Sequence, residues 1–170
     1  MKENVRNIIL IGMPGSGKST IGVVLAKRLG FRFVDSDLVI QEKYGKTLER
    51  LIDEYGDSGF IQIENDVNKS IEAEHTVIAT GGSAVYGSEA MQHLKSIGTV
   101  IYLEVSEEEL RERLGDLRER GVVSNGKTTV KEIFADRRAL YEKYADMVYF
   151  QKHRLLRDSV EELCRIICDK

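Results

Sequence analysis

The chain has little cysteine, proline or tryptophan. It has one proline, two cysteines and no tryptophan among 170 residues. Cys164 and Cys168 lie four residues apart with no further cysteine or histidine nearby, which excludes a zinc site and predicts two thiols on the buried side of a terminal helix. His75, His93 and His153 are scattered singly, in no metal-ligand or triad spacing, so we assign them no catalytic role.

Strong charge of one sign and long apolar runs are also missing. The net charge is −3 and no basic run exceeds a pair, which argues against a nucleic-acid partner. No stretch approaches the roughly 20 apolar residues of a membrane span, and the N-terminal "MKENVRN" lacks the apolar region of a signal peptide. The composition is typical of a globular protein. We expect one cytoplasmic, monomeric domain over residues 1–170.

The single proline stands inside a glycine-rich loop. The stretch "ILIGMPGSGKST" fits Gly-x-x-x-x-Gly-Lys-Ser/Thr, with Gly12, Gly17, Lys18 and Ser19 at the defining positions. An apolar β-branched run precedes the loop and an apolar pattern with helical spacing follows it, as this motif requires. The loop predicts a P-loop that binds a nucleoside triphosphate.

The chemistry of phosphate binding explains the residue types of the loop. Glycines let successive N–H groups point at an anion, and the following helix adds partial positive charge. We expect Lys18 to reach the outer phosphates, the Ser19 hydroxyl to bind Mg²⁺ and Pro14 to fix one φ angle of a preformed loop. The predicted nucleotide-binding residues of the loop are Gly12, Pro14, Gly15, Ser16, Gly17, Lys18, Ser19 and Thr20.

Short apolar runs alternate with helical patterns along the rest of the chain. This alternation predicts an α/β fold of the P-loop NTPase type, a three-layer arrangement with a parallel sheet between helices on both faces. The predicted strands are 7–11, 32–34, 76–79, 99–103 and 147–150. The predicted helices are 18–29, 36–44, 47–55, 60–73, 88–96, 107–117, 129–143 and 156–167. The polar, arginine-rich segment 115–129 predicts a mobile lid within this domain.

Two carboxylates, Asp35 and Asp37, directly follow a short apolar strand. In a doubly wound sheet this places them at the carboxyl edge, where ligands bind. Phosphoryl transfer needs a Mg²⁺ site and a group that orients the nucleophile. One carboxylate can face Mg²⁺ while the other faces a substrate hydroxyl. The alternative interpretation is that this Asp-Ser-Asp stretch only caps a helix.

These motifs, together with "TGGSAV" at 80–85 and "RRALY" at 137–141, resemble those of the shikimate kinases in order and spacing over almost the whole chain. The resemblance implies a five-stranded parallel sheet and phosphorylation of a shikimate hydroxyl by MgATP. It implies that Asp37 holds the substrate hydroxyls and acts as the base, and that Asp35 lies near Mg²⁺.

The resemblance assigns further residues. Gly81 and Gly82 match glycines that bring the backbone close to the substrate, and Arg137 matches the arginine that binds the shikimate carboxylate. Arg120 matches a lid arginine that closes on the phosphates, which implies a catalytic and nucleotide-binding role. Glu64 matches a glutamate of the substrate site.

Three positions depart from the family pattern. Ile61, in "FIQIE", stands where a second substrate arginine is expected, Ser83 replaces a third glycine and Gly121 replaces a lid proline. A charged hydrogen bond contributes about 1.5–3 kcal/mol, so the change at Ile61 weakens shikimate binding without abolishing it.

Glu64 thereby loses the cation with which the family pattern pairs it. A carboxylate in a cleft needs a replacement partner. Lys69, Arg137 and a cationic group on a different substrate are the alternatives.

Two other functions stay open. One is a sister kinase, similar to gluconate kinases, that phosphorylates another hydroxy acid or polyol. The other is a regulator that holds ATP without consuming a hydroxylated substrate. A GTPase is disfavoured because "NKSI" at 68–71 fails the last position of the Asn-Lys-x-Asp guanine motif.

Overall fold

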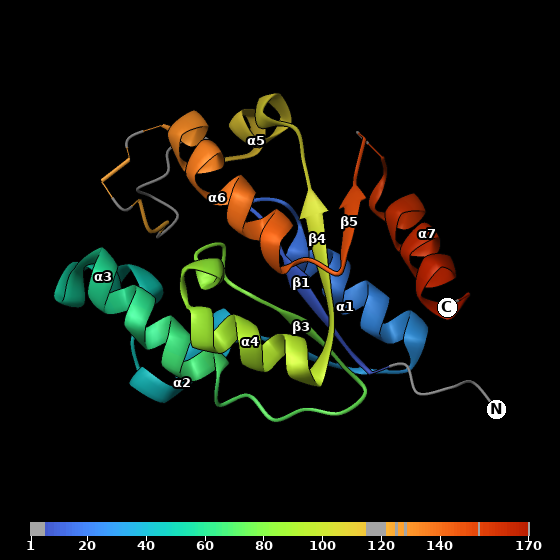
Figure 1. Ribbon diagram of the computed structural model, residues 1–170, viewed down its shortest axis with the longest axis horizontal. Coiled ribbons are helices and arrows are strands. Elements are labelled where there is room, and N and C mark those ends of the chain that lie inside the picture. The colour runs from blue at the N-terminus through green and yellow to red at the C-terminus, as the bar shows by residue number, and fades with distance from the viewer. Residues whose placement is uncertain (1–5, 115–121, 125, 128, 153, 170) are drawn as a thin grey trace.

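The computed structural model describes residues 6–114, 122–124, 126–127, 129–152 and 154–169, in which strands and helices alternate as predicted (Figure 1). The strands are β1 (Asn7–Ile11), β2 (Arg32–Asp35), β3 (Thr76–Ala79), β4 (Gly98–Glu104) and β5 (Met147–Phe150). The helices are α1 (Lys18–Leu29), α2 (Ser36–Tyr44), α3 (Leu48–Asn68), the 3₁₀ helix η1 (Ala84–Tyr86), α4 (Ser88–Ile97), α5 (Glu107–Leu114), α6 (Val130–Tyr144) and α7 (Leu156–Cys168).

All five strands pair in one parallel sheet with the order β2-β3-β1-β4-β5. The predicted α/β fold with five parallel strands is therefore confirmed. Because β1 pairs with β3, and β3 with β2, the loops that follow these three strands leave the same edge of the sheet side by side. The P-loop, the Asp35 region and the Thr80 region are brought together in this way.

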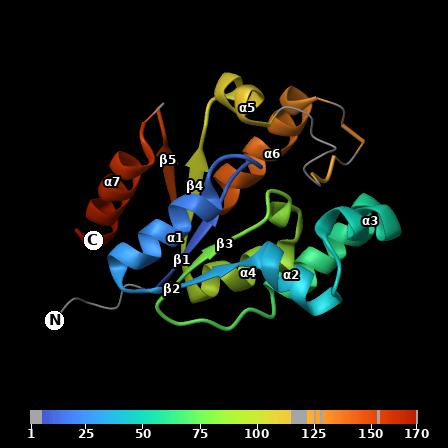
Figure 2. The same cartoon turned by 180° about the vertical axis from the view of Figure 1, so that it is seen from behind.

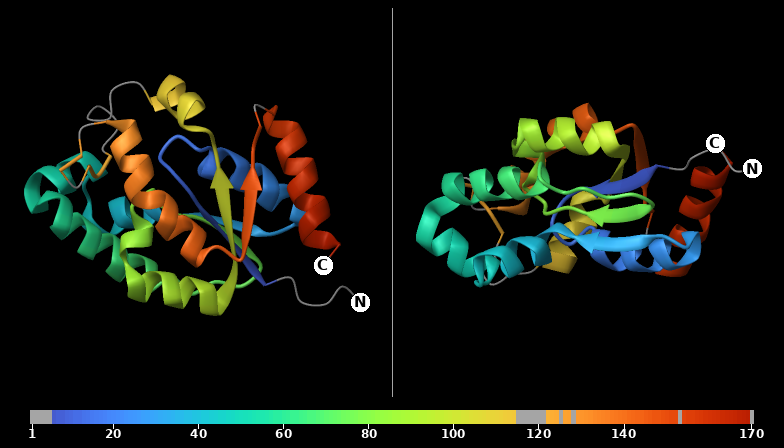
Figure 3. Two further views of the ribbon diagram at one scale, coloured as in Figure 1. Left: turned by 45° about the horizontal axis from the view of Figure 1, so that its top comes forward. Right: turned by 90° about the horizontal axis from the view of Figure 1, so that it is seen from below.

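Helices cover both faces of the sheet, as the views from behind and from below show (Figures 2 and 3). Side chains alternate across a strand, so Ile8 and Leu10 of β1 pack with α1 and α7, whereas Ile9 and Ile11 pack with α4, α5 and α6. All four side chains are buried, which explains why β1 is a continuous apolar run. A third apolar cluster joins α2 to α3 beside the sheet.

One helix differs from the prediction. The two helices expected between residues 47 and 73 form one run, Leu48–Asn68, kinked at Gly56, whose φ of 70° is not helical. The run ends before the predicted residue because the Ser70 hydroxyl and N–H both bond the Val67 carbonyl and close the last turn. This kinked helix carries Glu64 to the site.

Other predictions concern the surface and the proposed lid. Arg120 and Gly121 lie outside the described residues, so the closing lid at 115–129 stays a prediction. On α7, Cys164 is half-buried but Cys168 is exposed, so the expectation of two buried thiols was wrong for Cys168. None of the described helices has the length and apolar character needed to cross a membrane.

Candidate active site

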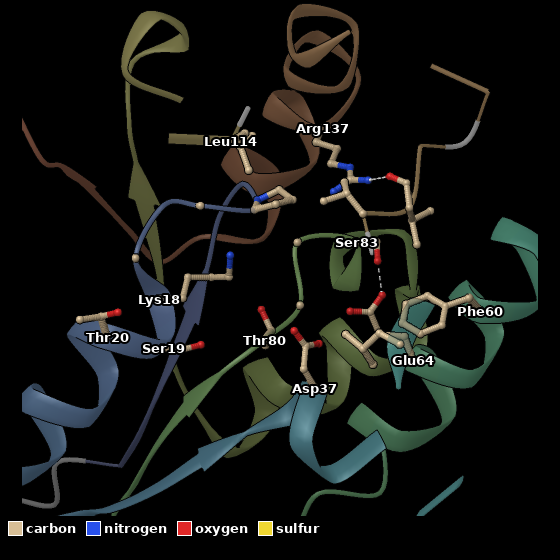
Figure 4. A pocket seen from close by; sticks show the side chains of 18 residues that line it. Lys18, Ser19, Thr20, Asp37, Phe60, Glu64, Thr80, Ser83, Leu114 and Arg137 are labelled. Atoms are coloured by element: carbon tan, nitrogen blue, oxygen red, sulfur yellow. Dashed lines mark hydrogen bonds between the residues drawn. The ribbon is translucent and has the colours of Figure 1, made fainter. Parts of the chain in front are cut away.

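The carboxyl ends of β1, β2 and β3 open into a cavity of about 310 Å³ (Figure 4). Ligand pockets of roughly this size and larger bind small molecules. Most of the predicted site residues line it, namely Pro14, Gly15, Gly17, Lys18, Ser19, Thr20, Asp37, Glu64, Gly81, Gly82 and Arg137. Among the other lining residues, the sequence marked Ser83 only as a departure from the family pattern. The remaining ones were not predicted as site residues, namely Leu48, Phe60, Thr80, Leu114, Val122 and Val123.

The P-loop is preformed around the side chain of Lys18. The Lys18 ammonium donates to the carbonyl oxygens of Gly12 and Met13, at 2.9 and 2.8 Å, and is nearly buried. Burial lowers the pKa of Lys18 to about 8, with the Asp37 carboxylate opposing the shift. Gly12, Gly15 and Gly17 all have positive φ, a conformation that side chains other than glycine rarely adopt. The loop thus holds the Lys18 ammonium at the cavity.

The contact between Pro14 and Gly82 accounts for both residue types. The Pro14 ring lies against the backbone of Gly82, where an added Cβ would be 2.6 Å from the ring. The proline therefore stiffens the P-loop and also packs it against the segment that follows β3. A hydrogen bond also fixes the P-loop, because the Gln151 side-chain amide donates to the Ser16 carbonyl at 2.6 Å. Gly12 and Ser16 support the loop without lining the cavity.

Asp35 has two roles at once. Its Oδ1 accepts from the Asp37 N–H at 3.0 Å and caps α2, while its Oδ2 accepts from the Ser19 hydroxyl at 2.6 Å. The helix-cap interpretation is therefore correct but incomplete. A hydroxyl and a carboxylate oxygen beside a P-loop fit Mg²⁺, which is usually held by one or two protein groups and phosphate oxygens. The described residues contain no group of three or more His, Cys, Asp or Glu side chains that could hold a metal ion.

Asp37 projects from the first turn of α2 toward the centre of the cavity (Figure 4). Burial raises its pKa to about 6, and the nearby Asp35 charge adds to the effect while Lys18 opposes it. A carboxylate with a pKa just below neutrality is ionised at working pH and still accepts a proton readily. This geometry suits a group that orients a hydroxyl.

Glu64 on α3 also points into the cavity and is 1% exposed. Its Oε2 accepts a hydrogen bond from the Ser83 hydroxyl, and its Oε1 has no hydrogen-bond partner. A Cβ at Gly81 would collide with Glu64 Oε1 and with Asp37 Oδ1, so a larger residue there would displace the two carboxylates. Burial, followed by the Asp37 charge, raises the pKa of Glu64 to about 7.

Arg137 on α6 faces these carboxylates across the cavity and is 1% exposed. Its Nη2 donates to the Val123 carbonyl, its Nε donates to the Tyr86 hydroxyl at 3.4 Å, and its guanidinium carbon lies 5.3 Å from the Tyr86 ring centre. The Tyr86 hydroxyl donates in turn to Asp136. The guanidinium is held in place by neutral groups, which leaves its charge available to an anion.

Comparisons with known proteins agree with this arrangement. The family model for shikimate kinase matches residues 14–168. The chain belongs to the shikimate kinase family. It is 36% identical over 169 residues to the shikimate kinase of Francisella tularensis subsp. holarctica, covering 97% of this chain and 96% of that protein. It is 38% identical over 138 residues to that of Persephonella marina, covering 81% of this chain and 84% of that protein.

A solved structure of the same family shares the fold. The shikimate kinase of Acinetobacter baumannii in complex with shikimate superposes with a TM-score of 0.86 at 30% sequence identity, over 98% of this chain and 95% of that one. The sequence comparisons and the structure comparison thus indicate the same family.

The structure shows which group takes the place of the missing cation beside Glu64. Lys69 is not the partner, because its ammonium pairs with Asp66 and Glu89 on the exposed side of α3. The hydrogen-bonding partner is Ser83, which sequence reasoning noted as a departure without connecting it to Glu64. The two residues are nineteen positions apart, so no local signal links them.

The raised pKa of Glu64 has a consequence for stability. In the unfolded chain the carboxyl loses its proton near its ordinary pKa of 4.5, whereas in the folded protein it keeps the proton until about pH 7. Stability is therefore unaffected below about pH 4.5, falls as the pH rises to about 7, and stays reduced above that. We expect Glu64→Gln to raise the free energy of unfolding at about pH 8 by on the order of 2–3 kcal/mol.

Thermal or urea unfolding of both proteins at about pH 5 and pH 8 measures this effect. The increase in the free energy of unfolding of Glu64→Gln should be small at the lower pH. An equal gain at both pH values would contradict the shifted pKa, and Gln62→Ala, on the exposed face of the same helix, is a control for general changes in helix stability.

Proposed function

We propose that this protein is a shikimate kinase, which transfers the γ-phosphoryl group of ATP to a hydroxyl of shikimate. The observation that carries the proposal is one cavity that holds the P-loop ammonium of Lys18, the carboxylate of Asp37 and the buried guanidinium of Arg137. Family membership and the Acinetobacter baumannii relative, whose structure is described as a complex with shikimate, support this choice of substrate.

In this proposal the phosphates of ATP bind to the P-loop. The backbone N–H groups of the loop and the N-terminus of α1 attract the phosphates, and Lys18 offsets negative charge on the transferring group. Mg²⁺, when bound, supplies further charge neutralisation, and Ser19 and Asp35 are the residues that would hold it. Arg120 remains a prediction for the lid: we propose that it binds the phosphates from segment 115–129.

Asp37 orients the reacting hydroxyl and takes its proton. Its carboxylate lies across the cavity from the P-loop and accepts the hydrogen bond of the attacking O–H. As the oxygen bonds to the γ-phosphorus and the bond to ADP breaks, the hydroxyl proton passes to the Asp37 carboxylate. Gly81 has no side chain beside this carboxylate, and we propose that the backbone of Gly81 and Gly82 approaches the substrate here.

Arg137 supplies the anion site that the proposed substrate requires. A guanidinium binds a carboxylate through two parallel hydrogen bonds, which fixes orientation as well as position. Since Arg137 is already oriented by Tyr86 and Val123, it contributes this contact with little reordering. A hydroxylated small-molecule carboxylate therefore fits the cavity better than a neutral polyol. We propose that the protein acts on it as a monomer.

An assay of ADP release tests the function. Shikimate should stimulate ADP formation strongly, whereas gluconate, neutral polyols and amino alcohols should not. Preferential stimulation by gluconate or a polyol would support the sister-kinase alternative instead. ADP formation that no acceptor stimulates would support a nucleotide-dependent regulator.

Ile61 tests the choice of substrate further. Its side chain is half-buried against the apolar cluster between α2 and α3, three residues before Glu64 and therefore its neighbour on the helix surface. We expect Ile61→Arg to lower the KM for shikimate by about tenfold, through a second charged contact with the carboxylate. The kcat should change little, because the contact exists in the ground state and the transition state alike.

Steady-state kinetics with saturating MgATP measure this change, and Ile61→Met controls for altered packing by an unbranched side chain without charge. A KM for shikimate that rises in Ile61→Arg, together with better use of another acceptor, would show that the site is built for a different substrate.

A further inference from the structure

The Ser83 hydroxyl is the one hydrogen-bond donor that the described residues offer to the buried Glu64 carboxylate. Ser83 itself is 6% exposed and lies just before η1, with ordinary backbone angles of φ −93° and ψ −1°. A serine is thus not demanded by the backbone at this position. The hydroxyl is the feature that sets it apart from an alanine.

Within the described residues, each cation near Glu64 donates its hydrogen bonds to other groups. Lys18 is bound to P-loop carbonyl groups, Arg137 is bound to Val123 and Tyr86, and Lys69 is paired on the exposed side of α3. Within the described part of the chain, no lysine or arginine forms an ion pair with Glu64. A neutral hydrogen bond from Ser83 is its partner instead.

The second oxygen of Glu64 is buried, unpartnered and directed into the cavity. This oxygen and Asp37 Oδ1 both approach the point where a Cβ of Gly81 would stand, so the two oxygens lie beside the same stretch of backbone. A buried acceptor without a donor is uncommon in folded proteins, and each case calls for an explanation. A hydroxyl group of the bound substrate would supply the missing donor.

We propose that Ser83 is a positioning residue: it holds Glu64 through Oε2, so that Oε1 accepts a hydrogen bond from a substrate hydroxyl next to the one that Asp37 binds. The inference rests on the proposed function and names Glu64 and Ser83 as residues that select a substrate with neighbouring hydroxyl groups. Ser83 touches Glu64, and Glu64 touches the substrate.

Electrostatics of the cavity support this role. The charged groups that influence Glu64 are Asp37 on α2, Lys18 on α1 and Arg137 on α6. Burial and Asp37 raise the pKa of Glu64, while the hydrogen bond from Ser83, Arg137 and Lys18 lower it. Ser83 therefore keeps more of Glu64 in the ionised form, which can only accept hydrogen bonds.

The test compares Ser83→Ala with wild type at about pH 8, where Glu64 is mostly ionised. We expect the KM for shikimate to rise about tenfold and kcat to stay within about threefold, because the lost contact acts on binding. Ser70→Ala is the matched control: it also removes a hydroxyl, which donates to the Val67 carbonyl at 2.7 Å and lies outside the cavity.

A second readout needs no substrate. Carbon-13 NMR of the Glu64 carboxyl, assigned by its loss in Glu64→Gln, should give a higher pKa in Ser83→Ala than in wild type and no change in Ser70→Ala. A merely structural role for Ser83 would lower stability without moving this pKa.

The outcomes separate the two proposals. A raised pKa with an unchanged KM for shikimate would overturn the inference, because Ser83 would hold Glu64 without any effect on the substrate. An unchanged pKa would overturn it as well. If wild-type protein does not phosphorylate shikimate at all, the proposed function fails, while the NMR measurement still decides whether Ser83 positions Glu64.

Discussion

Replacing Lys18 by alanine is expected to reduce phosphoryl transfer by about a thousandfold or more, the loss typical when a preorganised charge on the reacting group is removed. The Lys18 ammonium is already placed inside the P-loop by two carbonyl groups at 2.8 and 2.9 Å. Because the ammonium lies inside the loop that binds the phosphates, its charge is expected to act on the transferring group.

The experiment measures kcat from ADP release with shikimate, in Lys18→Ala and in Lys18→Met, which keeps the volume of the side-chain stem. Lys27→Ala, an exposed lysine on the last turn of the same helix, is the control. Melting temperatures check that the variants fold. Activity of either Lys18 variant within about threefold of wild type would show that the loop does not hold the reacting phosphates.

Asp37→Asn should give the second large effect. General bases contribute about 10²–10⁴-fold to rate, and an amide of similar shape cannot accept the hydroxyl proton. We expect kcat to fall by that factor while the Kd for ATP changes little, because Asp37 lies on the acceptor side of the cavity. Its neighbour Asp35, and not Asp37, is bonded to Ser19.

Kinetics and direct ATP binding, measured on the same preparations, separate these roles. Asp53→Asn, a carboxylate at an exposed position of α3, is the control for the change of one charge. A loss of ATP affinity as large as the loss of kcat would instead make Asp37 a residue of the magnesium or phosphate site.

Local sequence patterns were sufficient to predict much of the fold. The buried run Asn7–Ile11, the glycine loop and the helix after it form a unit whose parts are adjacent in the sequence, and the structure has all three in the predicted places. Asp35 and Asp37 were also placed correctly at the sheet edge, because any residue directly after a parallel strand reaches that edge.

Contacts between distant segments could not be predicted in the same way. The packing of Pro14 on Gly82 and the bond from Ser83 to Glu64 depend on how β3 lies beside β1 and how α3 returns to the sheet. The sequence marked Ser83 and Ile61 as departures from a pattern, but only the structure links Ser83 to Glu64. The fusion of two predicted helices at Gly56 depends likewise on packing that propensity does not contain.

Transfer of labelled phosphate tests the central claim most directly. The protein is incubated with shikimate and with ATP that carries radioactive phosphorus in its γ-phosphoryl group, and the products are separated. Our account predicts that the label moves to a phosphate ester of shikimate, with one molecule of ester for each molecule of ADP, and that Asp37→Asn lacks this product. Label found only in inorganic phosphate, or only in unreacted ATP, would contradict it.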